Sequence, residues 1–255
     1  MDVDRLFSPD GEQALVAAVR NRPLLAFDFD GTLAPIVARP DDARVPAPVA
    51  RRLQRLAASL PLAVITGRAV DDARRRLPFE PWRVVGNHGA EIEGAARAAW
   101  VHAAIEPARQ CLQANAGRLR DSGVWVEDKG ASIALHYRLA PDREAALAAI
   151  TLALAGLPKH LEVFGGKMVT NIVAAGAPDK GQALAALVAE CGASTAVFFG
   201  DDVNDEPVFD TALPHWLTVR VGLDDPGTRA RYVLDSLADL PRALDLMLEA
   251  IKATR

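Results

Sequence analysis

The sequence LLAFDFDG occupies residues 24–31 and joins a continuous apolar run to two aspartates and a glycine. A strand that is buried on both faces is apolar throughout, so this run predicts a central strand of a parallel sheet. Asp28 and Asp30 are two residues apart, which places them on one side of an extended chain, and Gly31 permits a sharp turn directly after them. We therefore expect a strand that presents two carboxylates at the edge of a sheet.

Strands of the same kind recur on both sides of this one and alternate with helical patterns. The further predicted strands are short apolar runs punctuated at their carboxyl ends, at residues 61–67, 82–89, 195–202, 217–222 and 231–235. The helical patterns between them cover residues 46–59, 69–77, 179–191, 204–211 and 237–253. Strand–helix alternation with right-handed crossovers predicts an α/β fold with a doubly wound parallel sheet.

The middle of the chain interrupts this alternation. The pattern there predicts two helix–strand–strand halves, with helices at 103–120 and 142–156 and strands at 124–130, 132–138, 161–166 and 167–173. We expect an α+β cap domain at residues 90–173, inserted into a core domain formed by residues 1–89 and 174–255.

Ligands of open parallel sheets bind outside the carboxyl ends of the strands, where this sequence gathers its polar residues. A carboxylate such as Asp28 can attack a phosphoryl group and form an aspartyl phosphate. A second carboxyl group, Asp30, can protonate the leaving oxygen and then activate water. The alternative is an ordinary helix cap followed by a turn, in which Asp and Gly-Thr are common.

Two further motifs suit the binding of a phosphate group. Thr66 ends a predicted strand and Gly67 follows it, so a hydroxyl and backbone N–H groups can contact phosphate oxygens there. Lys180 begins a predicted helix, where a cation is unfavourable unless an anion is bound. The alternatives are a helix cap for Thr66 and a solvated surface lysine for Lys180.

The segment GDDVNDE, residues 200–206, places four acidic residues directly after a predicted strand. Such a group suits a hard cation that prefers oxygen ligands, and Mg²⁺ with retained waters is the natural choice. An EF-hand is excluded because a strand precedes the acids and the required glycine and terminal glutamate are missing. We expect Mg²⁺ as the cofactor.

Together these motifs resemble the haloacid dehalogenase superfamily of phosphatases, through DFDGT, ITGR, DKG and GDDVNDE in this order. The resemblance implies a Rossmann-like core with Asp28 as nucleophile and Asp30 as general acid and base. It also implies that Thr66, Gly67 and Lys180 hold the phosphoryl group. The implied metal ligands are Asp28, Asp30 through its backbone carbonyl, Asp201 and, through a bound water, Asp205.

Within the superfamily the chain resembles bacterial trehalose-6-phosphate phosphatases along nearly its full length. The stretches that carry this likeness are DGTLAPI with Pro40 and Asp41, ITGR, GNHGAE, EDKGASIALHYR, FGGKMV and GDDVNDE. The resemblance implies hydrolysis of trehalose 6-phosphate and a functional link to a trehalose-phosphate synthase. The residues that it implies for contact with the sugar are Arg68, Asn87, His88, Lys129, Arg138, Lys167 and Asn171.

Two departures from the family pattern keep other substrates open. Asn171 stands where that family usually has an acidic residue, and Asn204 stands where it has threonine. The alternatives are a phosphatase for another phosphorylated glycoside, of the sucrose-phosphate or mannosyl-phosphoglycerate type, a non-catalytic sugar-phosphate-binding domain, and a phosphomutase.

Composition excludes several other classes of protein. A net charge of −4 without a basic tract argues against nucleic acid as a partner. No apolar run reaches the roughly 18–20 residues of a membrane helix, and we expect no signal peptide. Cys111 and Cys191 are too few and too far apart for a disulfide framework or a zinc site. We expect a cytoplasmic monomer.

Overall fold

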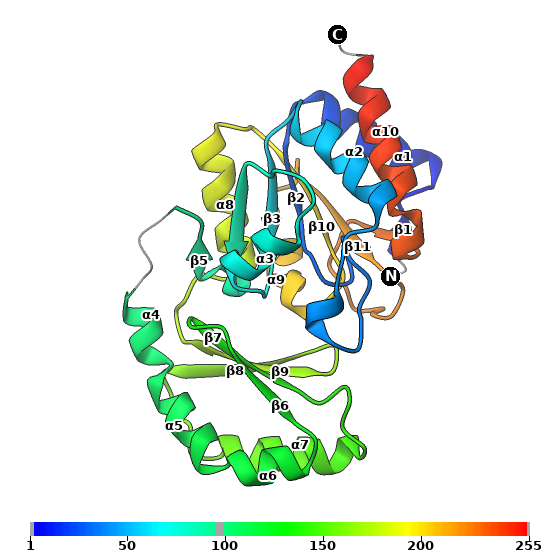
Figure 1. Ribbon diagram of the computed structural model, residues 1–255. Helices are drawn as coiled ribbons and strands as arrows, with labels where there is room; N and C mark the ends of the chain where they lie inside the picture. The colour runs from blue at the N-terminus through cyan, green and yellow to red at the C-terminus, as the bar shows by residue number, and fades with distance from the viewer. Residues whose placement is uncertain (1–2, 95–98, 254–255) are drawn as a thin grey trace. The chain divides into compact units, whose positions relative to one another are not determined.

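The computed structural model describes residues 3–94 and 99–253. The chain forms two compact units, which we call the core unit (Met1–Glu93 with Pro178–Arg255) and the inserted unit (Gly94–Ala177), both drawn in Figure 1. Each unit boundary lies four residues beyond the predicted one, at 93 in place of 89 and at 177 in place of 173. Within the described residues every helix is too short or too polar to cross a bilayer.

The core unit is built on an eight-stranded sheet with the order β1-β12-β11-β10-β2-β3-β4-β5. All neighbouring strands are parallel except β4 and β5, which are antiparallel. The strands are β1 (Asp4–Arg5), β2 (Leu24–Phe27), β3 (Leu62–Ile65), β4 (Arg83–Gly86), β5 (Glu91–Ile92), β10 (Ala196–Gly200), β11 (Leu217–Val221) and β12 (Tyr232–Leu234). The predicted doubly wound parallel sheet is confirmed, and two short edge strands, β1 and β5, are additional to the prediction.

Both faces of this sheet are covered by helices, which is why its central strands β2, β3 and β10 are apolar throughout. Leu25 and Phe27 pack on one face with residues of α1, α2 and α10. Leu24 and Ala26 point to the other face and pack with residues of α8 and α9. The helices are α1 (Pro9–Arg20), α2 (Ala47–Ala57), α3 (Val70–Arg76), α8 (Lys180–Cys191), α9 (Glu206–Thr211) and α10 (Leu240–Lys252).

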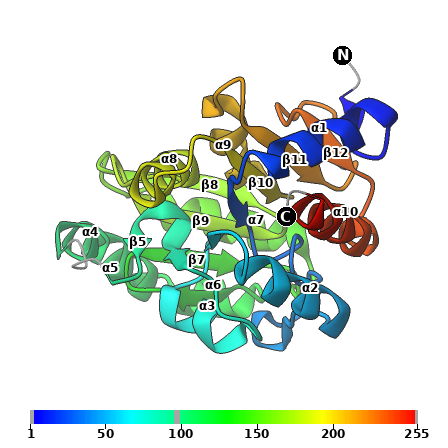
Figure 2. The same ribbon diagram turned by 90° about the horizontal axis from the view of Figure 1, so that it is seen from above.

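Helix α1 is an element that the sequence analysis did not predict. Its N-terminus is defined by Ser8, whose Oγ accepts from the Gly11 N–H at 3.1 Å, and by a proline at its first position. It has few buried apolar side chains, among them Leu15 and Val19, so its periodicity is weak. Helices α1 and α10 come from opposite ends of the chain and pack together, as Figure 2 shows.

Leu53→Ala is expected to destabilise the core unit by roughly 2–5 kcal/mol, because Leu53 is fully buried between α2 and the sheet and its removal leaves a cavity. Urea unfolding measures the change. The exposed neighbour Gln54 provides the control, since Gln54→Ala removes no buried surface. Equal stability of the two variants would contradict the packing described.

The inserted unit pairs one layer of helices with one antiparallel sheet of order β6-β7-β9-β8 (Figure 1). Ile133, Leu135 and Ile172 pack against the helices. The strands are β6 (Trp125–Asp128), β7 (Ser132–His136), β8 (Leu161–Gly166) and β9 (Val169–Ala174), and the helices are α4 (Ala99–Ala104), α5 (Glu106–Ala114), α6 (Ala116–Asp121) and α7 (Arg143–Leu154).

The prediction of one continuous helix at residues 103–120 is wrong. The structure has three short helices there, with breaks at Ile105 and Asn115. Pro107 near the start of α5 has no N–H to donate to the preceding turn, so the chain cannot continue from α4 as one regular helix. Asn115 ends α5, and its side chain Nδ2 donates to the Cys111 carbonyl at 2.9 Å.

Candidate active site

The carboxyl ends of three adjacent parallel strands bring the predicted core residues together. Strand β2 lies between β10 and β3, and Phe27 pairs with Phe199 and with Val64. Asp28 therefore leaves the sheet beside Asp201, which follows β10, and beside Thr66, which follows β3. The Asp28 N–H donates to the Phe199 carbonyl at 2.8 Å, which fixes the first residue beyond β2.

Lys180 binds two of these carboxylates in the interior of the core unit. Its Nζ donates to Asp28 Oδ1 at 2.8 Å and to Asp205 Oδ1 at 2.6 Å. Lys180 is 1% exposed, which excludes the alternative of a solvated surface lysine. Asp179 caps α8 and, with Gln182, closes a capping box, so the start of the helix holds Lys180 in place.

Burial and charge act on the pKa values of this pair in opposite directions. Burial raises the pKa of Asp28 well above its usual range, and the neighbouring charges of Asp205 and Asp201 add to the effect against the opposing Lys180. For Lys180, burial lowers the pKa, but the charges of Asp205 and Asp28 outweigh it and the pKa is raised. Lys180 therefore remains an ammonium, and Asp28 requires further positive charge to be ionised at low cost.

Asp28, Asp201 and Asp205 form a buried group that fits a metal ion. Each offers one carboxylate oxygen, and these oxygens all lie within 4.8 Å of one another. Three carboxylates against the one ammonium of Lys180 leave negative charge in a buried place, which a cation would compensate. The donors are all hard oxygens, the ligands of Mg²⁺ and Ca²⁺ and not of soft metals.

Two small residues after Asp30 let the chain approach Asp201 closely. A Cβ on Gly31 would lie 2.0 Å from Asp201 Oδ2, so only glycine fits, and its φ of +90° is one that glycine adopts readily. Thr32 is fully buried, and its Oγ1 donates to Asp201 Oδ1 at 3.1 Å. Thr32 was not among the predicted site residues, because its partner Asp201 is 169 residues away in the sequence.

Asp205 also shapes the acidic loop that follows β10. Its Oδ2 accepts from the backbone N–H groups of Asp201 at 2.9 Å and Asp202 at 3.0 Å. Asn204, one of the two departures from the family pattern, donates through Nδ2 to Asp202 Oδ2 at 3.0 Å. This bond of Asn204 lies within the loop, and Asp202 is not one of the three carboxylates of the candidate metal site.

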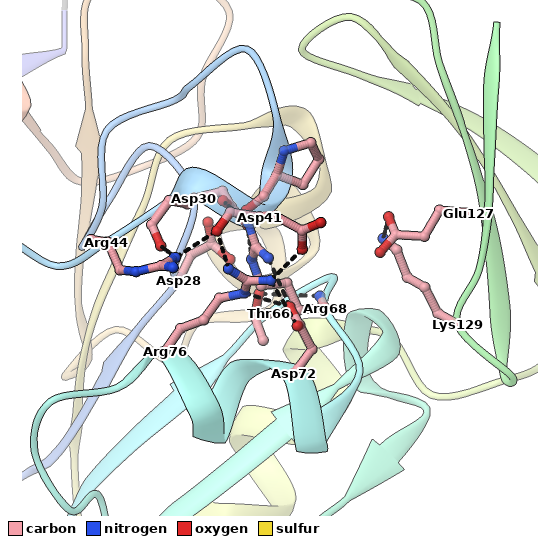
Figure 3. A network of polar contacts seen from close by, with 12 residues as sticks. Asp28, Asp30, Asp41, Arg44, Thr66, Arg68, Asp72, Arg76, Glu127 and Lys129 are labelled. Atoms are coloured by element: carbon pink, nitrogen blue, oxygen red, sulfur yellow. Dashed lines mark hydrogen bonds and ion pairs between the residues drawn. The ribbon is translucent and has the colours of Figure 1, made fainter.

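The Asp30 carboxylate does not belong to the group of three close carboxylates and contacts Arg68 instead (Figure 3). Arg68 Nε donates to Asp30 Oδ2 and Arg68 Nη2 to Asp30 Oδ1, both at 2.7 Å. The same guanidinium donates to Asp72 Oδ2 at 2.8 Å and to the Pro40 carbonyl at 2.9 Å. These acidic partners raise the pKa of Arg68 despite the opposing effect of its burial.

Thr66 does not cap the helix that follows it. Helix α3 begins at Val70, and the residue before it, Ala69, has no side-chain cap. The Thr66 Oγ1 accepts from the Arg68 N–H at 3.2 Å, so the hydroxyl orders the turn after β3. A Cβ on Gly67 would lie 2.3 Å from the His88 ring, so the glycine makes room for His88.

Asn87 and His88 belong to the turn after β4, in the short 3₁₀ helix Asn87–Gly89. Both have positive φ, +50° and +61°, a conformation that costs energy for residues other than glycine. The Asn87 side chain donates to Glu91 Oε2 at 2.7 Å, and the His88 N–H donates to the Thr66 carbonyl at 3.0 Å. The turns after β3 and β4 are therefore tied together.

The remaining predicted sugar contacts lie in the inserted unit, at two ends of its sheet. Arg138 Nη2 donates to the Lys167 carbonyl at 2.7 Å, which joins these two residues at the end where His136 pairs with Val169. Lys129 lies at the other end, in the β6–β7 turn, where its N–H donates to the Ser132 carbonyl at 2.9 Å. Asn171 pairs with Ala134 between them.

One acidic residue of this sheet was missed by the sequence analysis. Glu127 Oε2 lies 2.9 Å from His136 Nε2 and 3.8 Å from Lys129 Nζ. The ring of Trp125 stacks on His136 with centroids 4.8 Å apart. The spacing of Glu127 and Lys129, two residues apart on one predicted strand, was the signal that could have revealed the pair.

Comparisons with known proteins identify the family of this chain. The trehalose-phosphatase family matches residues 26–230 of the chain. A trehalose-phosphate phosphatase of Mycolicibacterium paratuberculosis is 35% identical over 93% of this chain and 65% of its own length. One from Mycobacterium marinum is 33% identical over 88% of this chain and 60% of its own, so the chain spans less than two thirds of either relative.

The fold is also that of a solved relative. The C-terminal domain of the C. albicans trehalose-6-phosphate phosphatase superposes with a TM-score of 0.82 at 20% identity, covering 97% of this chain and 98% of that one. The expected haloacid dehalogenase-like fold and the resemblance to trehalose-6-phosphate phosphatases are thus confirmed. The chain belongs to the trehalose-phosphatase family.

Proposed function

We propose that this chain hydrolyses trehalose 6-phosphate to trehalose and inorganic phosphate, with Mg²⁺ as cofactor. The observation that carries the proposal is the buried contact of Lys180 with Asp28 and Asp205, beside Asp201, at the strand ends of a trehalose-phosphatase family member. The mycobacterial relatives, described as trehalose-phosphate phosphatases, support the choice of substrate. A cytoplasmic location, a monomeric state and a link to a trehalose-phosphate synthase stay predictions.

In the first step Asp28 attacks phosphorus, and the bond between phosphorus and the sugar oxygen breaks. Asp30 gives a proton to that oxygen, so trehalose leaves and Asp28 carries the phosphoryl group. In the second step Asp30 takes a proton from a water that attacks phosphorus. The bond between phosphorus and the Asp28 oxygen then breaks, which releases phosphate and restores both carboxyl groups.

The other core residues hold the reacting groups in place. The bond from Lys180 to Asp28 supports a role in which the same ammonium also binds a phosphoryl oxygen. Thr66 offers a hydroxyl at the end of β3; its oxygen accepts from the Arg68 N–H, so its hydrogen can be donated to a phosphoryl oxygen, and Gly67 follows it in the same turn. Thr66 follows a strand directly beside β2, which supports its role as a phosphate ligand.

Asp28, the Asp30 carbonyl, Asp201 and Asp205 are the residues that would hold Mg²⁺. When bound, the ion supplies positive charge that screens the repulsion between the attacking carboxylate and the phosphate. The raised pKa of Asp28 supports this, since a buried carboxylate in this group needs such compensation to attack as an anion.

Alanine at Lys129 or Lys167 is expected to lower kcat/KM for trehalose 6-phosphate by roughly tenfold or more but to change hydrolysis of p-nitrophenyl phosphate little. Contacts to the glycosyl part stabilise the transition state only for a substrate that has one. Parallel phosphate-release assays on the two substrates measure the difference. The exposed Lys159, in the same unit, is the control, and Lys159→Ala should alter neither rate. Equal losses on both substrates would assign the lysines to chemistry or folding.

The proposed function is tested by phosphate release from a panel of esters with Mg²⁺. The panel contains trehalose 6-phosphate, sucrose 6-phosphate, glucose 6-phosphate, mannosyl-phosphoglycerate and p-nitrophenyl phosphate. We expect the highest kcat/KM for trehalose 6-phosphate. A higher kcat/KM for another ester would change the proposed substrate but leave the proposed phosphatase activity in place. No phosphate release from any ester would refute the phosphatase activity itself.

A further inference from the structure

Arg68 is committed to partners within the core unit and has little capacity left for a substrate. A guanidinium carries five N–H donors. At least four of these are engaged, since Arg68 makes two bonds to Asp30, one to Asp72 and one to the Pro40 carbonyl. Its carbon Cζ also lies 5.1 Å above the centroid of the Phe29 ring, and its side chain is only 7% exposed.

The Asp30 carboxylate, in contrast, is bound by Arg68 but remains partly exposed to solvent. Its side chain is 41% exposed. Two parallel bonds of 2.7 Å, one to each oxygen, fix both its position and the plane of the carboxylate. A carboxylate has about four lone-pair sites, so these two bonds leave each oxygen able to exchange a proton with a ligand.

Arg68 is itself fixed by a ladder of alternating charges, which Figure 3 shows. Asp72 accepts from Arg68 and also from Arg76, at 2.8 Å for Arg76 Nε and 2.9 Å for Arg76 Nη2. Arg76 continues to Asp41, at 2.7 Å to its side chain and 2.7 Å to its carbonyl. The pKa of Asp72 is lowered because these arginines outweigh the effect of burial, so the ladder stays charged at neutral pH.

We propose that Arg68 is a positioning residue that holds the Asp30 carboxylate for its proton transfers and does not contact the sugar. The inference rests on the proposed function, in which Asp30 is the acid and base. It replaces the sugar-binding role that the family resemblance implied for Arg68. A misplacement of a reacting group by about 1 Å can cost about 10²-fold in rate, which is the scale of effect that loss of such a clamp can have.

Arg68→Met is expected to lower kcat by about 10- to 10²-fold and to change KM for the sugar phosphate by no more than about twofold. Arg68→Lys keeps the charge but cannot bridge two oxygens, so it should recover only part of kcat. Both variants should fold, because Asp72 keeps Arg76 as a partner and Asp30 is open to solvent. Thermal unfolding checks this.

A double-mutant cycle with Asp30→Asn separates the two roles of Arg68. If Arg68 acts only through Asp30, Arg68→Met in the Asp30→Asn background should change kcat/KM by no more than about twofold. Multiplicative losses, with the double variant a further tenfold below Asp30→Asn, would overturn the proposal. The control is Arg74→Met, which removes ion pairs with Glu93 and Glu80 but none with Asp30, and should leave kcat unchanged.

Binding without turnover gives the second arm of the test. Trehalose 6-phosphate is titrated calorimetrically into Asp28→Asn and into Asp28→Asn with Arg68→Met. The proposal predicts dissociation constants within about twofold of each other, and a tenfold weaker affinity of the double variant would show that Arg68 binds the substrate. Failure of wild-type protein to hydrolyse any sugar phosphate would refute the proposed function instead, so the two failures are distinguishable.

Discussion

Asp28→Asn is expected to abolish turnover of every phosphate ester while leaving the protein folded. The amide keeps the size of the carboxylate but cannot attack phosphorus. The other two carboxylates of the candidate metal site, Asp201 and Asp205, follow β10 and not β2. We expect kcat to fall by at least about 10⁴-fold, to the limit of detection, because loss of the nucleophile removes the contribution of the whole set of catalytic residues that act with it. Steady-state phosphate release measures it.

The fold of Asp28→Asn should be as stable as that of the wild type, or more stable, in the absence of metal. Burial disfavours the charged form of Asp28 and raises its pKa, so a neutral side chain of the same shape removes an unfavourable group. Thermal unfolding in EDTA checks this. Asp210→Asn, at an exposed ion pair with Arg229, is the control for charge removal and should retain full activity. A folded Asp28→Asn protein with normal turnover would end the covalent mechanism.

Removal of divalent metal should abolish activity. Asp201→Ala should require a far higher Mg²⁺ concentration for activity. Asp201 is 1% exposed and belongs to the group whose oxygens lie within 4.8 Å, so its loss removes a ligand and also the partner of Thr32. We expect the Mg²⁺ concentration for half-maximal activity to rise at least about tenfold, the scale on which outer contacts to metal ligands act. Calcium should bind but support turnover poorly, because its coordination shell is larger and looser.

Metal titration by calorimetry provides a readout of this prediction that does not depend on turnover. Mg²⁺ should bind the wild type and bind Asp201→Ala at least tenfold more weakly. Asp202→Asn is the control, because Asp202 neighbours Asp201 in the loop but is outside the group of close oxygens. Full activity of the wild type in excess EDTA would contradict the metal site.

The core of the fold could be predicted from the sequence because its strands are buried on both faces. Runs such as LLAF at Leu24–Phe27 and AVFFG at Ala196–Gly200 have no polar face, and only a sheet covered on both sides requires that. Parallel strands end at one edge, so the neighbourhood of Asp28 and Asp201 follows from the same pattern. Lys180 was predictable since a lysine at a helix N-terminus needs an anion nearby.

Features that depend on side-chain direction or on weak periodicity could not be predicted. Helix α1 has too narrow a buried stripe, and the break before α5 depends on where Pro107 falls within a longer apolar pattern. Arg68 follows a phosphate-binding motif, but its partner Asp72 and the Pro40 carbonyl turn it toward Asp30. Contacts between residues far apart in the sequence decide how such side chains are oriented, and the local sequence does not predict these contacts.

The account is tested most directly by trapping the phosphoryl group on Asp28. The Asp30→Asn variant, which lacks the proposed base, is mixed with Mg²⁺ and p-nitrophenyl phosphate, whose leaving group needs no proton. The reaction is quenched with acid, and peptide mass spectrometry locates the phosphoryl group. The account predicts phosphorylation at Asp28, and no phosphorylation in the double variant that carries Asp28→Asn as well as Asp30→Asn. A phosphoryl group on any other residue, or release of phosphate by this variant without a phosphorylated Asp28, would contradict it.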